Sequence, residues 1–161
     1  MFLEWIKYCK PSVLGIVTCM VAGLGSITPA SGFIGPMGAI VIGISAGIIC
    51  FGATNFIKRT LKIDDSLDVF PVHGVGGIIG TILTGVFVAR QFGGTGLAEG
   101  VSISDQVMVQ LTAVAVVIAW TAIASFICLK LADMICGLRV YQESETNGLD
   151  ISEHEEKGYN L

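Results

Sequence analysis

The residue best suited to chemistry is His73, because it is an ionisable residue inside a long apolar run of the chain. Pro71 precedes it by two residues, and three of the next four residues are glycine. An imidazole buried without a charged partner is expected to be neutral, with one nitrogen that donates a hydrogen bond and one that accepts. Such a group can exchange hydrogen bonds with a small polar species without holding it by charge. The pattern therefore favours a pathway for a small molecule that can change its protonation state.

A structural role for His73 is the alternative, in which the ring bonds to a carbonyl of a neighbouring helix. An ionisable residue inside a membrane span indicates function by default, because it is costly there without partners. The proline and the glycines around it also favour a cavity, since packing alone does not require a bent and thinned helix. We favour the functional role and keep the structural one open.

Signatures of catalysis are absent from the sequence. There is no phosphate-binding loop, no GxSxG motif, and no set of His, Cys, Asp and Glu spaced as metal ligands. The other histidine, His154, lies in a polar segment far along the chain from His73. The five cysteines form no CxxC pair and fall mostly in apolar runs, where a thiol behaves as a small hydrophobe. We expect a protein that is not an enzyme and needs no metal or cofactor.

The composition indicates a membrane protein. Of the 161 residues 53% are hydrophobic and only 14% are charged, whereas about 25% are charged in soluble domains. The net charge of −4 arises from an acidic tail that begins near residue 139. This acidity is confined to the tail, so the charge pattern favours neither nucleic acid nor a lipid surface as a partner.

Four apolar runs are long enough, or nearly so, to cross a lipid bilayer. They cover residues 13–28, 38–56, 67–89 and 107–132. The first run is short for a span of about 20 residues, so it needs neighbouring helices to complete it. The runs predict an all-α, polytopic transmembrane helical bundle in residues 1–135, followed by a tail in residues 136–161. We see no cleavable signal before the first run and expect the spans themselves to direct insertion.

Thr28 and Asp68 lie where two of these runs meet irregular backbone. Thr28 begins an uncharged stretch rich in turn formers, and such backbone is tolerated at membrane depth only in a protein interior or beside a water-filled cavity. Thr28 is therefore a candidate pathway residue, although a hydroxyl bonded to its own helix carbonyl is an equally good explanation. The polar turn at 64–66 is expected to close one span and cap the next, and Asp68 is a second candidate to cap that helix, whose first turn tolerates Pro71. The packing face of that helix is expected to contain three glycines, Gly74, Gly77 and Gly80.

The start of the first run and the inner loops carry the remaining local signals. Ser12 is expected to be the N-cap of the first long helix. If residues 1–12 are cytoplasmic, nearly all basic residues of the loops lie inside and only Arg90 lies at the outer end. We therefore expect a protein of the inner or plasma membrane with a cytoplasmic C-terminal tail. The tail is polar and is expected to be loosely ordered alone.

Several motifs resemble the ammonium transporter and Rhesus glycoprotein family. The most specific are DVFPVHGVGG at 68–77 and GLRV at 137–140. Shorter similarities extend over almost the whole chain: KPS at 10–12, ITPA at 27–30, FIG at 33–35, KR at 58–59, DD at 64–65, TG at 84–85, GLD at 148–150 and YN at 159–160. The tail favours the bacterial ammonium-transporter branch over the Rhesus branch.

The resemblance implies a homotrimer of eleven-span, inverted-repeat subunits, each with a narrow hydrophobic pore lined by two histidines. His73 is similar to the second histidine of that pair. Thr28 and Val69 are similar to pore-lining residues, and Asp68 is similar to an acidic residue near the inner end of the same helix. The implied substrate is ammonium, which is deprotonated and conducted past the histidines as ammonia, with proton transfer accompanying it.

The tail is similar to the cytoplasmic segment of the family. The resemblance covers Gly137, Arg139 and Asp150. In the family this segment couples subunits and, in bacteria, lies near the docking site of a PII-type nitrogen signal protein.

The similarity covers only the last part of such a transporter, from the end of the seventh span to the C-terminus. The partner histidine and the outer ammonium site of the first half have no counterpart. Because the substrate path of an inverted-repeat transporter lies between its halves, no transport is expected from this chain alone. The alternatives are a non-conducting membrane or regulatory partner of full-length subunits and a truncated product without function.

Overall fold

The computed structural model describes residues 2–158, and this described part contains helices and loops but no strand. The chain divides into two compact units, residues 1–115 and 116–161. Four helical segments are long and apolar enough to cross a membrane: Val13–Ala30, Pro36–Thr60, Phe70–Phe87 and Ile103–Cys136. The predicted all-α fold with several transmembrane helices is confirmed. The motif at 159–160 lies outside the described residues.

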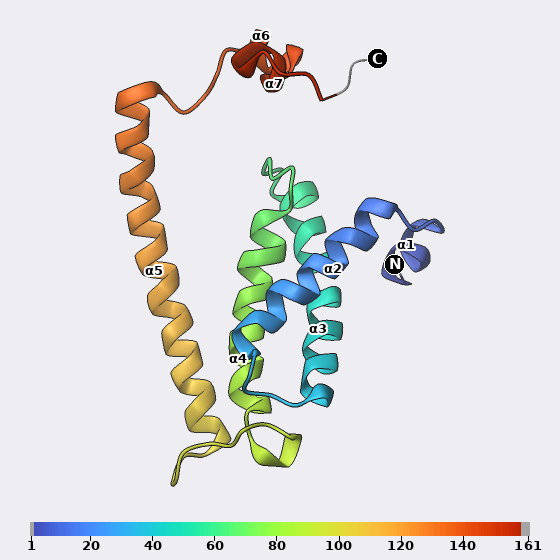
Figure 1. Cartoon of the computed structure of the whole chain (residues 1–161), viewed down its shortest axis with the longest axis vertical. Coiled ribbons are helices and arrows are strands. Elements are labelled where there is room, and N and C mark those ends of the chain that lie inside the picture. Colours follow the sequence, from blue (N-terminus) through green and yellow to red (C-terminus); the bar gives the residue numbers. More distant parts are fainter. Residues whose placement is uncertain (1, 159–161) are drawn as a thin grey trace. The chain divides into compact units, whose positions relative to one another are not determined.

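The first unit contains helices α1 (Phe2–Tyr8), α2 (Val13–Ile27), α3 (Pro36–Asn55) and α4 (Gly76–Phe87), shown in Figure 1. Short 3-10 or π-helical turns extend or join them at Thr28–Ala30, Phe56–Thr60, Phe70–Val75 and Arg90–Phe92. Helix α5 (Ile103–Cys136) begins in this unit and continues into the second. The second unit also contains α6 (Gln142–Asn147) and α7 (Leu149–His154).

Helix α1 is held against α2 and α3 by polar contacts. Ser12 is the N-cap of α2, as predicted, because its hydroxyl accepts a hydrogen bond from the N–H of Gly15 at 2.9 Å. Glu4 accepts hydrogen bonds from the N–H of Ser12 at 3.3 Å and from its hydroxyl at 2.9 Å. The ammonium group of Lys7 lies 5.7 Å from the centre of the Phe51 ring, within the range of a cation–π interaction.

Ala22 of α2, Cys50 of α3 and Val72 before α4 form the core of the first unit, and α2 and α4 cross closely beside it. A Cβ atom added to Gly76 would lie 2.7 Å from the hydroxyl oxygen of Ser26, and one added to Gly80 would overlap the Ser26 carbonyl. Small residues at such a crossing let two helix backbones approach closely. The predicted packing face is partly wrong, because Gly80 belongs to it but Gly77 faces open space. The observed contact follows residues spaced four apart, Gly76 and Gly80, and not the expected row spaced three apart.

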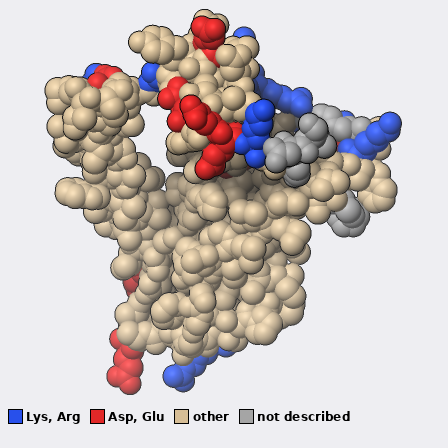
Figure 2. Space-filling view, turned by 45° about the horizontal axis from the view of Figure 1, so that its top comes forward, with Lys and Arg blue, Asp and Glu red and all other residues tan. Residues whose placement is uncertain are grey.

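Helix α5 differs from the others because none of its residues is buried. Ser102 caps it: the Ser102 hydroxyl accepts from the N–H of Asp105 at 3.2 Å, and the Asp105 carboxylate accepts from the N–H of Ser102 at 3.0 Å. This reciprocal pairing satisfies two N–H groups at the helix start. Figure 2 shows a broad surface free of Lys, Arg, Asp and Glu side chains, as expected for helices surrounded by lipid.

Candidate functional site

His73 lies in the π-helical turn Phe70–Val75, directly before α4, and its side chain is exposed on the first unit. Val69 lies four residues earlier and is 52% exposed, so the two side chains occupy the same side of the helix start. Within residues 2–158 the imidazole takes part in no hydrogen bond. The predicted structural alternative, a ring bonded to a carbonyl of a neighbouring helix, is therefore not seen in the described part of the chain.

The neighbour of His73 on α2 is Gly25. A Cβ atom added to Gly25 would lie 3.5 Å from Nδ1 of His73 and 3.9 Å from the carbonyl oxygen of Val72. These are ordinary contact distances, so one methyl group fits there and a larger side chain reaches the ring. Gly25 therefore lets the imidazole pack closely against α2, a role that the sequence alone did not indicate.

Asp65 fixes the start of the helix that carries His73. Its carboxylate accepts hydrogen bonds from the N–H groups of Val69 and Phe70, each at 2.9 Å. These bonds, that of Phe70 first, hold the pKa of the Asp65 carboxyl below its usual value, and Lys58 acts in the same direction. The next residue, Pro71, has no N–H and so needs no partner at this position. Of the two caps predicted for this helix, the polar turn at 64–66 is confirmed through Asp65, which satisfies the free N–H groups, and Asp68 is wrong.

Asp68 is instead buried, with 9% of its surface exposed. Its Oδ1 atom lies 2.8 Å from Nζ of Lys58, and this ion pair is the partner of that buried oxygen. The backbone of Asp68 has a φ of +56°, a conformation that costs non-glycine residues on the order of 1–3 kcal/mol. The ion pair therefore holds a strained residue at the helix start. The sequence carries a signal for this pair, because opposite charges flank the short loop between two spans.

Thr28 is exposed at the end of α2, three residues beyond Gly25. Its hydroxyl donates a hydrogen bond to the carbonyl of Leu24 at 2.8 Å. The bond is the one that the alternative explanation of Thr28 requires, and it still leaves the hydroxyl oxygen accessible. Gly25 in α2, Thr28 at its end and His73 directly before α4 thus border one exposed side of the unit.

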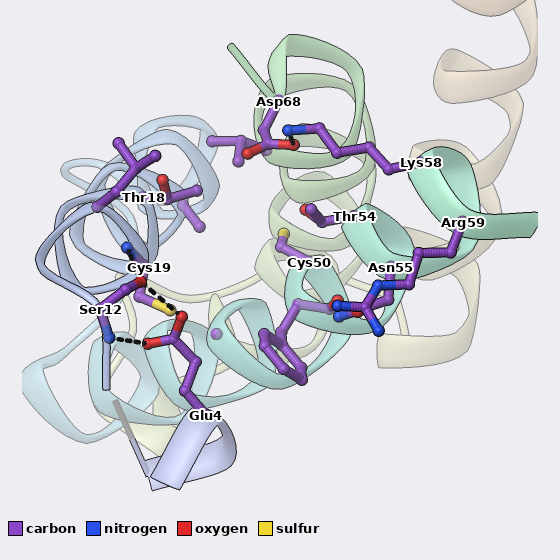
Figure 3. A pocket seen from close by; sticks show the side chains of 16 residues that line it. Glu4, Ser12, Thr18, Cys19, Cys50, Thr54, Asn55, Lys58, Arg59 and Asp68 are labelled. Carbon is purple, nitrogen blue, oxygen red and sulfur yellow. Dashed lines mark hydrogen bonds and ion pairs between the residues drawn. The ribbon is translucent and has the colours of Figure 1, made fainter. Parts of the chain in front are cut away.

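A cavity of about 240 Å³ lies on a different side, between α2, α3 and the start of the His73 helix. Thr18, Cys19, Cys50 and Thr54 line its interior, and Lys58 and Asp68 lie at its edge, as Figure 3 shows. Val72 lines it as well, but His73 does not. The site therefore has two sides, a partly open cavity of mixed polar and apolar lining next to Asp68 and an exposed side at His73. The predicted residues fall on both sides, Asp68 on the first and His73 on the second, but the cavity itself was not predicted.

The tail residues are described within the second unit. Gly137 has a φ of +78°, which glycine adopts without strain. Arg139 forms an exposed ion pair with Glu145 at 3.2 Å. The carbonyl of Asp150, in α7, accepts a hydrogen bond from the N–H of Glu156 at 2.8 Å. The polar tail is thus folded into two short helices, α6 and α7.

The described residues hold no group of three or more His, Cys, Asp or Glu side chains that could bind a metal ion. The family model described as Ammonium Transporter Family matches residues 1–159. The chain belongs to this family. With four helices long and apolar enough to span a membrane, this member of the family is a multi-pass membrane protein.

Individual relatives agree with the family match. The chain is 44% identical to an "Ammonium transporter" of Aquifex aeolicus, over 100% of this chain and 38% of that protein. It is 45% identical to "Ammonium transporter Amt1" of Archaeoglobus fulgidus, over 99% of this chain and 40% of that protein. A solved structure named "Sensor Amt Protein" matches with a TM-score of 0.84 and 32% identity, over 94% of this chain and 37% of that one. The chain thus spans about two-fifths of the length of these relatives.

Proposed function

We propose that this chain is the C-terminal part of an ammonium transporter and supplies one pore histidine, His73, when the N-terminal part is present. The observation that carries the proposal is the exposed imidazole of His73, which lies within a segment apolar enough to span a membrane. An imidazole facing lipid is costly. The exposed side is therefore better explained as one wall of a path that a second part of the protein completes.

The residues around His73 suit an uncharged permeant. A neutral imidazole has one donor and one acceptor nitrogen. Thr28 adds a hydroxyl and Val69 an apolar surface on the same side of the unit. Such a wall can pass ammonia while excluding hydrated ions, because it offers hydrogen bonds without a fixed charge. The family resemblance adds an eleven-span inverted-repeat subunit, a second histidine from the other half, and a homotrimer.

The tail is proposed to be cytoplasmic and to serve regulation. The basic residues of the loops favour this orientation, and the resemblance assigns Gly137, Arg139 and Asp150 to a segment near a PII-type nitrogen signal protein. The membrane would then be the inner or plasma membrane of the cell. A variant in which every lysine except Lys157 is replaced by methionine tests this orientation. A membrane-impermeant amine reagent added to intact cells should leave a cytoplasmic Lys157 unlabelled.

A second candidate function is that of a non-conducting partner of full-length subunits. The exposed side at His73 also favours this second function. A surface that binds the missing half can also bind the corresponding part of a full-length subunit. Co-expression separates the two functions. A partner of this kind lowers uptake by full-length subunits, whereas a piece of a transporter restores uptake to the missing N-terminal part.

The test is methylammonium uptake by cells in which this chain is joined to the first seven spans of a relative. His73→Ala is expected to change rate or selectivity sharply, because the pore loses its hydrogen-bonding ring. His154→Ala, which alters the other histidine of the chain, is the matched control and should leave uptake unchanged. If His73→Ala also leaves both rate and selectivity unchanged, the pore function of His73 is wrong.

The chain alone is expected to conduct nothing. Liposomes that contain only residues 1–161 should show no saturable ammonium current, since the path lacks one wall. A clear saturable current would refute the need for the first half.

A further inference from the structure

The ion pair between Lys58 and Asp68 connects two elements that the loop between them separates. Lys58 lies in the π-helical turn Phe56–Thr60 that ends the α3 span, and Asp68 directly precedes the helix that carries His73. The carbonyl of Asp68 also accepts a hydrogen bond from the N–H of Val72 at 3.0 Å. Asp68 is therefore both the first anchored residue of the His73 helix and a partner of the preceding span.

The direction of the Asp68 side chain separates it from the exposed side of the site. Asp68 and Lys58 point toward each other at the edge of the cavity in Figure 3. The Asp68 side chain is only 13% exposed, whereas Val69 and His73 are exposed on the other side. A carboxylate held in this way does not face a molecule that passes His73.

The capping residue Asp65 cannot replace this ion pair. Asp65 bonds to Val69 and Phe70 within the same short loop and helix start, and Lys58 attracts its carboxylate without an ion pair between them, so Asp65 fixes mainly the local backbone. The ion pair of Asp68 fixes the place of the helix relative to α3, because its two charges come from different spans. The His73 ring lies at contact distance from α2, so a shift of the helix start moves the ring relative to Gly25.

We propose that Lys58 and Asp68 are a positioning pair that sets the inner end of the His73 helix, and with it the imidazole against Gly25. Lys58 thereby becomes a residue of the site, and Asp68 acts through His73 and not by contact with the permeant. The inference rests on the proposed function only in treating His73 as the pore residue. The placement of the ring is a property of this chain and is tested without transport.

The energetic role of the pair follows from its unequal burial. Exposed ion pairs contribute little to stability, but the buried carboxylate of Asp68 requires its partner, because an unpaired buried charge is strongly disfavoured. Loss of Lys58 therefore favours a turn of the Asp68 side chain toward water. That turn moves the first residue of the helix.

The experiment uses the two histidines of the chain as separate reporters. The 161-residue chain is labelled with 15N-histidine and reconstituted in nanodiscs, where it gives imidazole signals of His73 and His154. Lys58→Met and Asp68→Asn are each expected to shift the His73 signals and to leave the His154 signals in place. Lys58→Arg is expected to retain the wild-type His73 signals, because its guanidinium group also pairs with a carboxylate.

A double variant covers the case in which a single variant fails to fold. Lys58→Met with Asp68→Leu leaves no unpaired charge, so it is expected to keep the helix content of the wild type and still to shift the His73 signals. Lys62→Met removes a neighbouring cation of the same loop and is the matched control, with no shift expected.

Two results overturn the proposal: wild-type His73 signals in the folded double variant, or equal shifts in Lys58→Arg, Lys62→Met and Lys58→Met. Uptake measured on the joined full-length protein answers a different question. If His73→Ala does not alter uptake while Lys58→Met shifts the His73 ring, the proposed function fails and the positioning pair stands. If the reverse is found, the pore histidine stands and the positioning role of the pair fails.

Discussion

Helices α4 and α5 are both apolar, yet the chain uses them in opposite ways. In the most apolar 18-residue stretch of the α4 segment, 33% of the residues are buried within the chain. In the corresponding stretch of α5, 0% of the residues are buried. The segment of α4 is also the less hydropathic of the two, because it contains the proline, the histidine and the glycines of the site. The helix that carries His73 is therefore held in place by contacts within the chain. Helix α5 has no buried residue and depends on lipid or other protein around it.

The largest effect is expected at the crossing of α2 and α4. Gly80→Leu should destabilise the first unit by about 3 kcal/mol or more, because its side chain has to displace the Ser26 backbone. Gly77→Leu is the control, since Gly77 has open space around it, and it should change stability by less than about 0.5 kcal/mol. Reversible unfolding in mixed micelles, followed by circular dichroism, measures both. Equal losses would mean that the crossing does not hold α4 in place.

Membrane insertion of the isolated segments tests the same contrast. Residues 103–136, placed in a host protein with glycosylation sites on both sides, should insert almost completely. Residues 70–87 should insert only in part, because histidine, proline and glycine lower the apolar driving force. His73→Leu should raise the insertion of the second segment. Equal insertion of both wild-type segments would show that α4 does not need its neighbours.

Ser26 gives a smaller and opposite effect. Its hydroxyl is fully buried and has no hydrogen-bond partner among the described residues, so Ser26→Ala should stabilise the first unit by about 1 kcal/mol. Ala22→Ser, one turn earlier on the same side of α2, is the reverse change and should destabilise it by a similar amount. The unfolding assay used for Gly80 measures both. Destabilisation by Ser26→Ala would show that the hydroxyl has a bonding role.

The smallest expected effect concerns Asp65 at low pH. Because its pKa is lower in the folded chain, its contribution is present above the unfolded pKa of about 3.9 and is lost as the pH falls through the folded pKa. The wild type should therefore lose stability below about pH 4, and Asp65→Asn should lose less over the same interval. Thermal melts from neutral to acidic pH measure this difference. Asp64→Asn, next to it, is the control and should behave as the wild type.

The sequence predicted the fold class because apolar runs and loop charges are properties of composition. It also identified Ser12 as a cap, since capping depends on residues close in sequence. It left two candidate caps for the His73 helix, the polar turn at 64–66 and Asp68, because Asp65 and Asp68 are equivalent in type and only the backbone at Asp68, with φ of +56°, decides which one faces the helix. The π-helical turn that moves the packing face from Gly77 to Gly76 has no counterpart in hydropathy.

The predicted residues fall on both sides of the site, but the cavity was not predicted. His73 was identified from its place in an apolar run and Val69 from the family resemblance, and their exposure is consistent with a wall for a path. Gly25 and Lys58 were missed, because their roles arise from contacts between helices that are far apart in sequence. The cavity was missed for the same reason, since Thr18 and Thr54 line it together only after α2 and α3 pack.

The hydrogen bond of Thr28 has a consequence for the direction of recognition. The hydroxyl donates its only proton to the Leu24 carbonyl, so it can accept a hydrogen bond from a passing molecule but cannot donate one. Along the proposed path, Thr28 therefore favours molecules that carry N–H bonds over pure acceptors such as anions. A hydroxyl bonded to its own helix selects in this way for hydrogen-bond donors.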